Sequence, residues 1–129
     1  MKQDEEKITV FLIDDDEFLL DMYALKFKSS GFKVEVAYGA KEALDKLKKG
    51  FHPDVVLLDI VMPKLDGFAF LEILKKEKLL KDSLVIILSN LGQKDDIEKG
   101  RLLGAADYIV KARFTPTEVV EKVKTLLKK

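Results

Sequence analysis

Short apolar runs alternate along the chain with longer segments of helical periodicity. The clearest run, Val55 to Leu58, leads into Asp59 and is closed by Pro63. A short, continuous apolar run of this kind predicts a strand that is buried on both faces. Strands are expected over 8–13, 33–37, 54–58, 84–88 and 107–111, and helices over 17–30, 40–49, 67–78, 94–103 and 115–129.

Helix ends carry their own sequence signals. Glycines in the C′ position follow three of the expected helices, namely Gly31, Gly50 and Gly104. Thr115 and Glu118 form a capping-box pattern, with Pro116 at the first helical position. The first helix is predicted from an apolar stripe at helical spacing, formed by Phe18, Leu19, Met22, Leu25 and Phe27.

Five strands alternate with five helices through short connections. Each parallel crossover needs a helix to return the chain to the same edge, so this succession predicts a doubly wound parallel sheet. The 129 residues suffice for one domain with a real core and are too few for an appended catalytic or DNA-binding domain. We expect a polar tail over 1–7 and one domain over 8–129.

Composition narrows the classes of function. Basic and acidic residues balance at 23 each and the pI is about 6.6, which disfavours a general nucleic-acid binder. The absence of cysteine excludes disulfides, thiol catalysis and zinc–thiolate sites. No apolar run approaches the ~18 residues of a membrane span, and the polar N-terminus is unlike a signal peptide. A soluble cytoplasmic protein is therefore expected.

Polar side chains follow the expected strands where a parallel sheet gathers its chemistry. The residues at these ends are Asp14, Asp15, Asp16, Asp59, Ser89, Asn90 and Lys111. Clustered carboxylates repel and raise one another's pKa values unless a cation lies among them, and such oxygen ligands suit Mg²⁺. A lysine and a hydroxyl beside them lack an acceptor until an anion arrives. This set predicts a site for a phosphoryl group on Asp59, with Asp59 as nucleophile.

Simpler interpretations exist for individual residues. Asp59 could open a turn, and Lys111 could be a solvated strand end. For Asp16 a helix N-cap is favoured over a metal ligand. His52, the single histidine, precedes Pro53 in an expected loop and is a poor candidate for carrying phosphate.

Taken together, residues 8–129 resemble the receiver domain of two-component response regulators. The resemblance rests on the acid pair Asp14-Asp15, on Asp59 with Met62-Pro63 and Asp66-Gly67 after it, and on Ser89, Tyr108 and Lys111. It implies a five-stranded flavodoxin-like sheet of order 2-1-3-4-5 with five helices, and a regulator of the stand-alone type.

The resemblance also implies roles for these residues. Asp59 is the phosphoacceptor, and Ser89 and Lys111 close on the phosphoryl group. Tyr108 is the switch aromatic. The ligands of Mg²⁺ are Asp14, Asp15, Asp59 and the backbone carbonyl of Val61. Because such a domain catalyses only its own phosphorylation and dephosphorylation, it is not an enzyme in the usual sense.

The partners implied are a histidine kinase or a phosphotransfer protein, with a small acyl phosphate as an alternative donor. The output face would be formed by the expected helix 94–103, strand 107–111 and the last helix. A downstream protein or a second copy of the chain would bind there, with no direct contact to nucleic acid or membrane.

Three alternatives differ in testable ways. A hydrolase that forms an aspartyl phosphate would need a second acid close after Asp59, and none follows there. A flavodoxin-like cofactor carrier would need a phosphate-binding loop where this chain has three acids. A degenerate or engineered receiver that acts only as an interaction module would lack the lysine or the acids.

Two local features depart from the family pattern. The family usually has proline, often after a cis bond, where this chain has Ala112. A non-proline cis bond costs ~3 kcal/mol or more, so we predict a trans Lys111–Ala112 bond and a reshaped loop around Phe114.

The second feature concerns dephosphorylation. Val61 and Leu91 cannot hold the attacking water and Asn90 narrows its access, unless the Asn90 amide orients that water, so we predict slow hydrolysis.

Overall fold

The computed structural model describes residues 7–62 and 66–128. Its strands are β1 (Thr9–Ile13), β2 (Lys33–Ala37), β3 (Val55–Leu58), β4 (Leu84–Ser89) and β5 (Asp107–Val110). Its helices are α2 (Glu17–Ser29), α3 (Ala40–Lys48), α4 (Gly67–Lys76), α5 (Lys94–Leu102) and α6 (Pro116–Leu127), with a short 3₁₀ helix η1 (Lys111–Arg113). The predicted alternation of strands and helices is confirmed. The expected tail lies outside the described residues except for Lys7.

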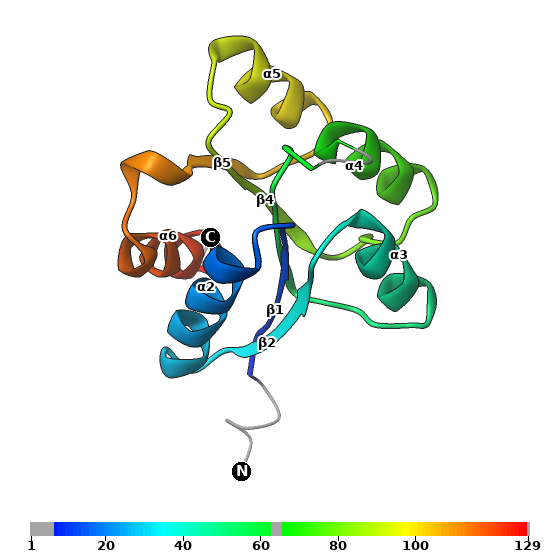
Figure 1. The fold of residues 1–129 in the computed structure, drawn as a ribbon. Coiled ribbons are helices and arrows are strands. Elements are labelled where there is room, and N and C mark those ends of the chain that lie inside the picture. Colours follow the sequence, from blue (N-terminus) through cyan, green and yellow to red (C-terminus); the bar gives the residue numbers. More distant parts are fainter. Residues whose placement is uncertain (1–6, 63–65, 129) are drawn as a thin grey trace.

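The strands form one parallel sheet in the order β2-β1-β3-β4-β5, as predicted. Helices α2 and α6 cover one face and α3, α4 and α5 lie on the other (Figure 1). Successive residues of β1 point to opposite faces: Val10 packs with α2 and α6, and Phe11 packs with α3 and α4. Both faces of the central strands are therefore buried, which explains their continuous apolar runs.

The end signals of the helices act as predicted. Gly31, Gly50 and Gly104 have φ values of 97°, 106° and 99°, the left-handed conformation that ends a helix at low cost. The Thr115 hydroxyl accepts the N–H of Glu118 at 3.1 Å, and the Glu118 carboxylate accepts the N–H of Thr115 at 2.8 Å. This capping box fixes the start of α6.

The apolar stripe that predicted α2 is not its buried face. The helix buries Leu20, Tyr23, Ala24 and Phe27. Phe18 is 81% exposed and Leu25 is 71% exposed. Of the predicted stripe, only Phe27 belongs to the buried face and Leu19 packs against it in part. Periodicity found the helix correctly but chose the wrong side, because α2 carries two apolar stripes and the buried one includes Tyr23 and the small Ala24.

The solvent-facing stripe borders a groove between two helices. Met22 and Leu25 of α2 line it together with Pro116 and Thr117 at the start of α6. We call Phe18, Met22 and Leu25 the α2 ridge. Within residues 7–62 and 66–128, no helix has the length and apolar content needed to cross a membrane.

Candidate functional site

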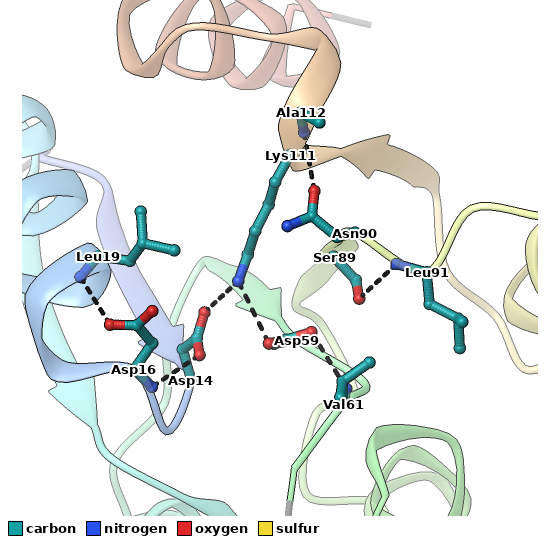
Figure 2. Close-up of polar contacts among 10 residues, drawn as sticks. All are labelled: Asp14, Asp16, Leu19, Asp59, Val61, Ser89, Asn90, Leu91, Lys111 and Ala112. Atoms are coloured by element: carbon teal, nitrogen blue, oxygen red, sulfur yellow. Dashed lines mark hydrogen bonds and ion pairs between the residues drawn. The ribbon is translucent and has the colours of Figure 1, made fainter.

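The carboxyl ends of four strands bring the predicted residues together (Figure 2). Asp14 follows β1 and Asp59 follows β3; these strands are paired neighbours, with Ile13 opposite Leu58. Ser89 is the last residue of β4 and Lys111 follows β5. Asp14, Asp59 and Ser89 are the buried polar residues of the described chain. The convergence expected from the sequence is confirmed.

Three acids form a cluster with the geometry of a cation site. One carboxylate oxygen from each of Asp14, Asp15 and Asp59 lies within 4.8 Å of the other two. Asp14 and Asp59 are buried and Asp15 is exposed, so the cluster is open to solvent on one side. Hard oxygen ligands with an open position suit Mg²⁺, which keeps part of its water shell when bound.

Lys111 lies among these acids. Its Nζ is 2.6 Å from Asp14 Oδ2 and 3.2 Å from Asp59 Oδ2, and all three side chains are at most 8% exposed. The expectation that the lysine lacks a partner until an anion arrives is therefore wrong. Buried carboxylates without a counter-charge are costly, and the long side chain of Lys111 can reach both.

Burial and the contacts between these residues change the pKa values of Asp14 and of Lys111. Burial raises the pKa of Asp14, and the hydrogen bond from Lys111 offsets this only in part; the charge of Asp59 adds a smaller increase. Burial alone would lower the pKa of Lys111, but the Asp14 hydrogen bond and the charges of both acids outweigh it and leave that pKa raised. The increase predicted for the acid pKa thus occurs at Asp14, with burial rather than mutual repulsion as its main cause.

Three of the four strand-end side chains also stabilise the turn that follows them. The acceptor oxygen and the N–H two residues later are 3.0, 3.1 and 3.2 Å apart in the pairs Asp14 and Asp16, Asp59 and Val61, and Ser89 and Leu91. Asp59 does open a turn, as the simpler interpretation held, but it uses only Oδ1 for this purpose. The other oxygen faces Lys111, so the two interpretations are compatible.

Asp16 and His52 are placed as expected, and a further acid caps a second helix. Asp16 Oδ1 accepts the N–H of Leu19 at 3.2 Å, so Asp16 is the N-cap of α2. Asp66 caps α4 in the same manner through Ala69, at 2.9 Å. His52 is exposed in the loop that enters β3, at the opposite end of the sheet from the acid cluster.

Gly67 brings helix α4 against the loop that follows Asp59. Its N–H donates to the carbonyl oxygen of Ile60 at 2.9 Å. A Cβ atom at this position would lie 2.3 Å from Ile60 Cα, so only glycine fits without a backbone shift. Pro63 of the predicted motif lies outside the described residues.

The loop after β4 contacts both β5 and the loop after β5 through hydrogen bonds that the sequence did not reveal. The N–H of Ala112 donates to Asn90 Oδ1 at 2.9 Å, and the hydroxyl of Tyr108 donates to the carbonyl oxygen of Leu91. The sequence predicted a role for Asn90 only through its bulk or through holding a water molecule. The sequence did contain a signal for this hydrogen bond. Ala112 has a backbone N–H that the usual proline would lack, and Asn90 offers a short side chain with an acceptor oxygen. The Lys111–Ala112 bond is trans, as predicted, and Lys111–Arg113 form η1.

Tyr108 of β5 is half-buried beside the loop after β4. Burial, and then the charges of Asp96 and Asp59, raise its pKa to about 12. Its ring also faces Gly100 of α5, where an added Cβ would lie 3.3 Å from the tyrosine ring. Val61 and Leu91 are both exposed beside the site.

A comparison with known families decides what this arrangement is. The model of the response regulator receiver domain matches residues 10–124. The chain belongs to this family. Receiver domains work with histidine kinases in two-component signal transduction and are not a family of conventional enzymes.

The relatives and structural neighbours are other regulators. The probable transcriptional regulator ycf27 of Guillardia theta is 34% identical over 125 residues, 97% of this chain and 47% of the relative. PhoB of Escherichia coli, a phosphate regulon regulatory protein, is 29% identical over 120 residues, 93% of this chain and 52% of the relative. The chain thus spans about half the length of the curated relatives it matches.

Solved receiver structures have the same fold. The receiver domain of the Francisella response regulator 1452 has a TM-score of 0.83 and 34% identity, covering 95% of this chain and 98% of that one. A CheY-like receiver domain protein from Methanospirillum hungatei has a TM-score of 0.84 and 28% identity, with 95% of each chain covered. The triad Asp14, Asp15 and Asp59 is consistent with the metal site typical of receiver domains.

Proposed function

We propose that this receiver domain is a phosphoacceptor switch that takes a phosphoryl group on Asp59. The donor is the phosphohistidine of a histidine kinase or phosphotransfer protein, or a small acyl phosphate. The observation that carries the proposal is a buried carboxylate at the end of the central strand, with two further acids and a lysine around it. One oxygen of Asp59 forms the bond to phosphorus as the bond to the leaving group breaks, and the leaving group departs with that electron pair.

The metal ligands in this proposal are Asp14, Asp15, Asp59 and the backbone carbonyl of Val61. Bound Mg²⁺ supplies positive charge for the transferring oxygens. Lys111 supplies a second positive charge. Asp59 Oδ1 is used in the turn, so Oδ2 is the oxygen available to bond to phosphorus. Lys111 holds Oδ2 at 3.2 Å, so this contact has to change when Asp59 reacts.

Ser89 and Tyr108 connect the phosphoryl group to the surface. The Ser89 oxygen accepts the N–H of Leu91, which leaves the hydroxyl proton free to donate to a phosphoryl oxygen. A shift of Ser89 toward the phosphoryl group also moves Leu91, whose carbonyl holds the Tyr108 hydroxyl. Tyr108 then changes the face formed by α5, β5 and α6. A differential interaction of a few kcal/mol suffices for such a two-state change.

Partners follow from the surfaces available. The α2 ridge lies on the helix that begins just after Asp14 and Asp15, so a kinase domain bound there can present its phosphohistidine to Asp59. A downstream protein, or a second copy of the chain, reads the face of α5, β5 and α6. The balanced charge favours proteins over nucleic acid at these surfaces.

The decisive experiment is incubation with Mg²⁺ and acetyl phosphate, followed by intact mass measurement. The wild type should gain one phosphoryl group, and Asp59→Asn should gain none. Asp16→Asn is the matched control, because it removes a neighbouring acid yet retains a good N-cap, and it should be phosphorylated normally. A wild type that gains no phosphoryl group would leave the chain as an interaction module only.

A further inference from the structure

One hydrogen bond joins the two loops that carry Ser89 and Lys111. Asn90 directly follows Ser89, and its Oδ1 accepts the N–H of Ala112, the residue after Lys111, at 2.9 Å (Figure 2). The bond connects residues 22 positions apart in the chain. It therefore fixes one loop relative to the other.

This bond lies where the regular sheet stops. The last paired residues of β4 and β5 are Ser89 and Val110, so Lys111 is the first residue beyond the ladder. Within η1 the nearest support is the bond from the Phe114 N–H to the Lys111 carbonyl, which is long at 3.3 Å. The next firm anchor is the capping box at Thr115. The Asn90 side chain thus provides one further link just past the ladder.

The backbone at Lys111 matters because its side chain is long. The ammonium is at present held by Asp14 and Asp59. In the proposed reaction both acids change partners, so the carboxylates no longer define the position of Nζ. What then remains to orient the side chain is the backbone from which it extends.

We propose that Asn90 is a positioning residue that fixes the backbone of Lys111 through Ala112, so that the ammonium is placed for the incoming phosphoryl group. This inference rests on the proposed function of Asp59. In this proposal the Asn90 amide oxygen binds the Ala112 N–H. It does not hold the water that hydrolyses the aspartyl phosphate.

A double-mutant cycle isolates the bond. Ala112→Pro removes the donor N–H, and Ala112→Gly is the matched control that keeps it. Asn90→Ala should slow acetyl phosphate-driven phosphorylation roughly three- to tenfold more in the wild-type and Ala112→Gly backgrounds than in the Ala112→Pro background. The space opened by removing the amide affects access in every background, so this effect cancels in the cycle. An equal effect of Asn90→Ala in all backgrounds would overturn the proposal.

Hydrogen exchange separates positioning from general loosening. In Asn90→Ala, exchange of the Ala112 amide should accelerate while the midpoint of urea unfolding shifts little. If the wild type is not phosphorylated at all, the proposed function of Asp59 fails. The exchange rate then decides whether Asn90 holds the Ala112 backbone, and an Ala112 rate unchanged in Asn90→Ala would refute the positioning role.

Discussion

The Lys111 ammonium lies nearer to Asp14, at 2.6 Å, than to Asp59, the proposed phosphoacceptor, at 3.2 Å. In this state the lysine supplies part of the positive charge that a divalent cation would bring to the same acids. Metal binding and the Lys111 contacts are therefore expected to compete for Asp14. A cation that also binds Asp59 would compete with Lys111 for that carboxylate in the same way.

Removing the lysine tests this relationship. Lys111→Met leaves two buried carboxylates without their counter-charge, so the free energy of unfolding without metal should fall by about 3–5 kcal/mol. Mg²⁺ should restore more stability to the variant than it adds to the wild type, because it replaces the missing charge. Urea unfolding with and without MgCl₂ measures both effects. Lys122→Met, which removes a partly exposed lysine 3.6 Å from Asp107, is the control and should change little.

Tyr108 should titrate late. Its pKa is raised to about 12 by burial and by the nearby acids, against an ordinary value of 10.0. The folded state therefore keeps the phenol proton when the unfolded chain has lost it, so the stability linked to Tyr108 is complete below pH 10 and declines as the pH rises toward 12. Absorbance titration near 295 nm should show one phenolate signal in this upper range that Tyr108→Phe lacks. A Tyr108 signal that appears at pH 10 would contradict the increase in its pKa that burial and the charges of Asp96 and Asp59 cause.

We predict that the lifetime of the phosphorylated form depends on the exposed residues Val61 and Leu91. Neither side chain can hold a water in line with phosphorus, and the Asn90 amide oxygen already accepts the Ala112 N–H. We expect slow loss of phosphate after the donor is removed. Val61→Asn and Leu91→Glu should each accelerate the decay by roughly tenfold, which corresponds to ~1.4 kcal/mol of barrier. Decay within seconds in the wild type, or no change in either variant, would refute this account.

The two apolar stripes of α2 differ in what they stabilise. Phe27 is 0% exposed, so Phe27→Ala should cost about 3–5 kcal/mol of unfolding free energy. Phe18 is 81% exposed, and Phe18→Ala should change it by less than about 0.5 kcal/mol. If the α2 ridge is the kinase surface, Phe18→Ala should also slow phosphotransfer from a histidine kinase while leaving phosphorylation by acetyl phosphate intact. If Phe18→Ala and Phe27→Ala lowered the free energy of unfolding equally, the Phe18 side chain would not be exposed to solvent as the structure has it.

The success of the sequence in predicting the fold has a physical basis. Strands buried on both faces must be apolar throughout, as in Val55 to Leu58, and left-handed helix ends favour glycine, as at Gly31. These constraints are local, so they can be read without knowing the tertiary structure. The choice of the buried face of α2 depends on the neighbouring α6, which the periodicity of α2 alone does not contain.

The site was predictable to a similar extent. Parallel strands carry their end residues to one edge, and this rule placed Asp14, Asp59, Ser89 and Lys111 correctly. Which of these side chains contact each other was harder to predict, because a contact depends on distances that the spacing in the sequence does not give. The ion pair of Lys111 with Asp14 and the Asn90–Ala112 hydrogen bond are two such contacts.

The close fit at Gly67 ties the start of α4 to the backbone next to Asp59. Backbone touches backbone between Gly67 and Ile60, so we expect these two residues to move together. The loop after β4 is instead linked to Tyr108 of β5 and to Ala112 by single side-chain hydrogen bonds, which can break and re-form. A partner that binds over the start of α4 should therefore meet a similar shape before and after phosphorylation, whereas one that binds beside Tyr108 could distinguish the two states.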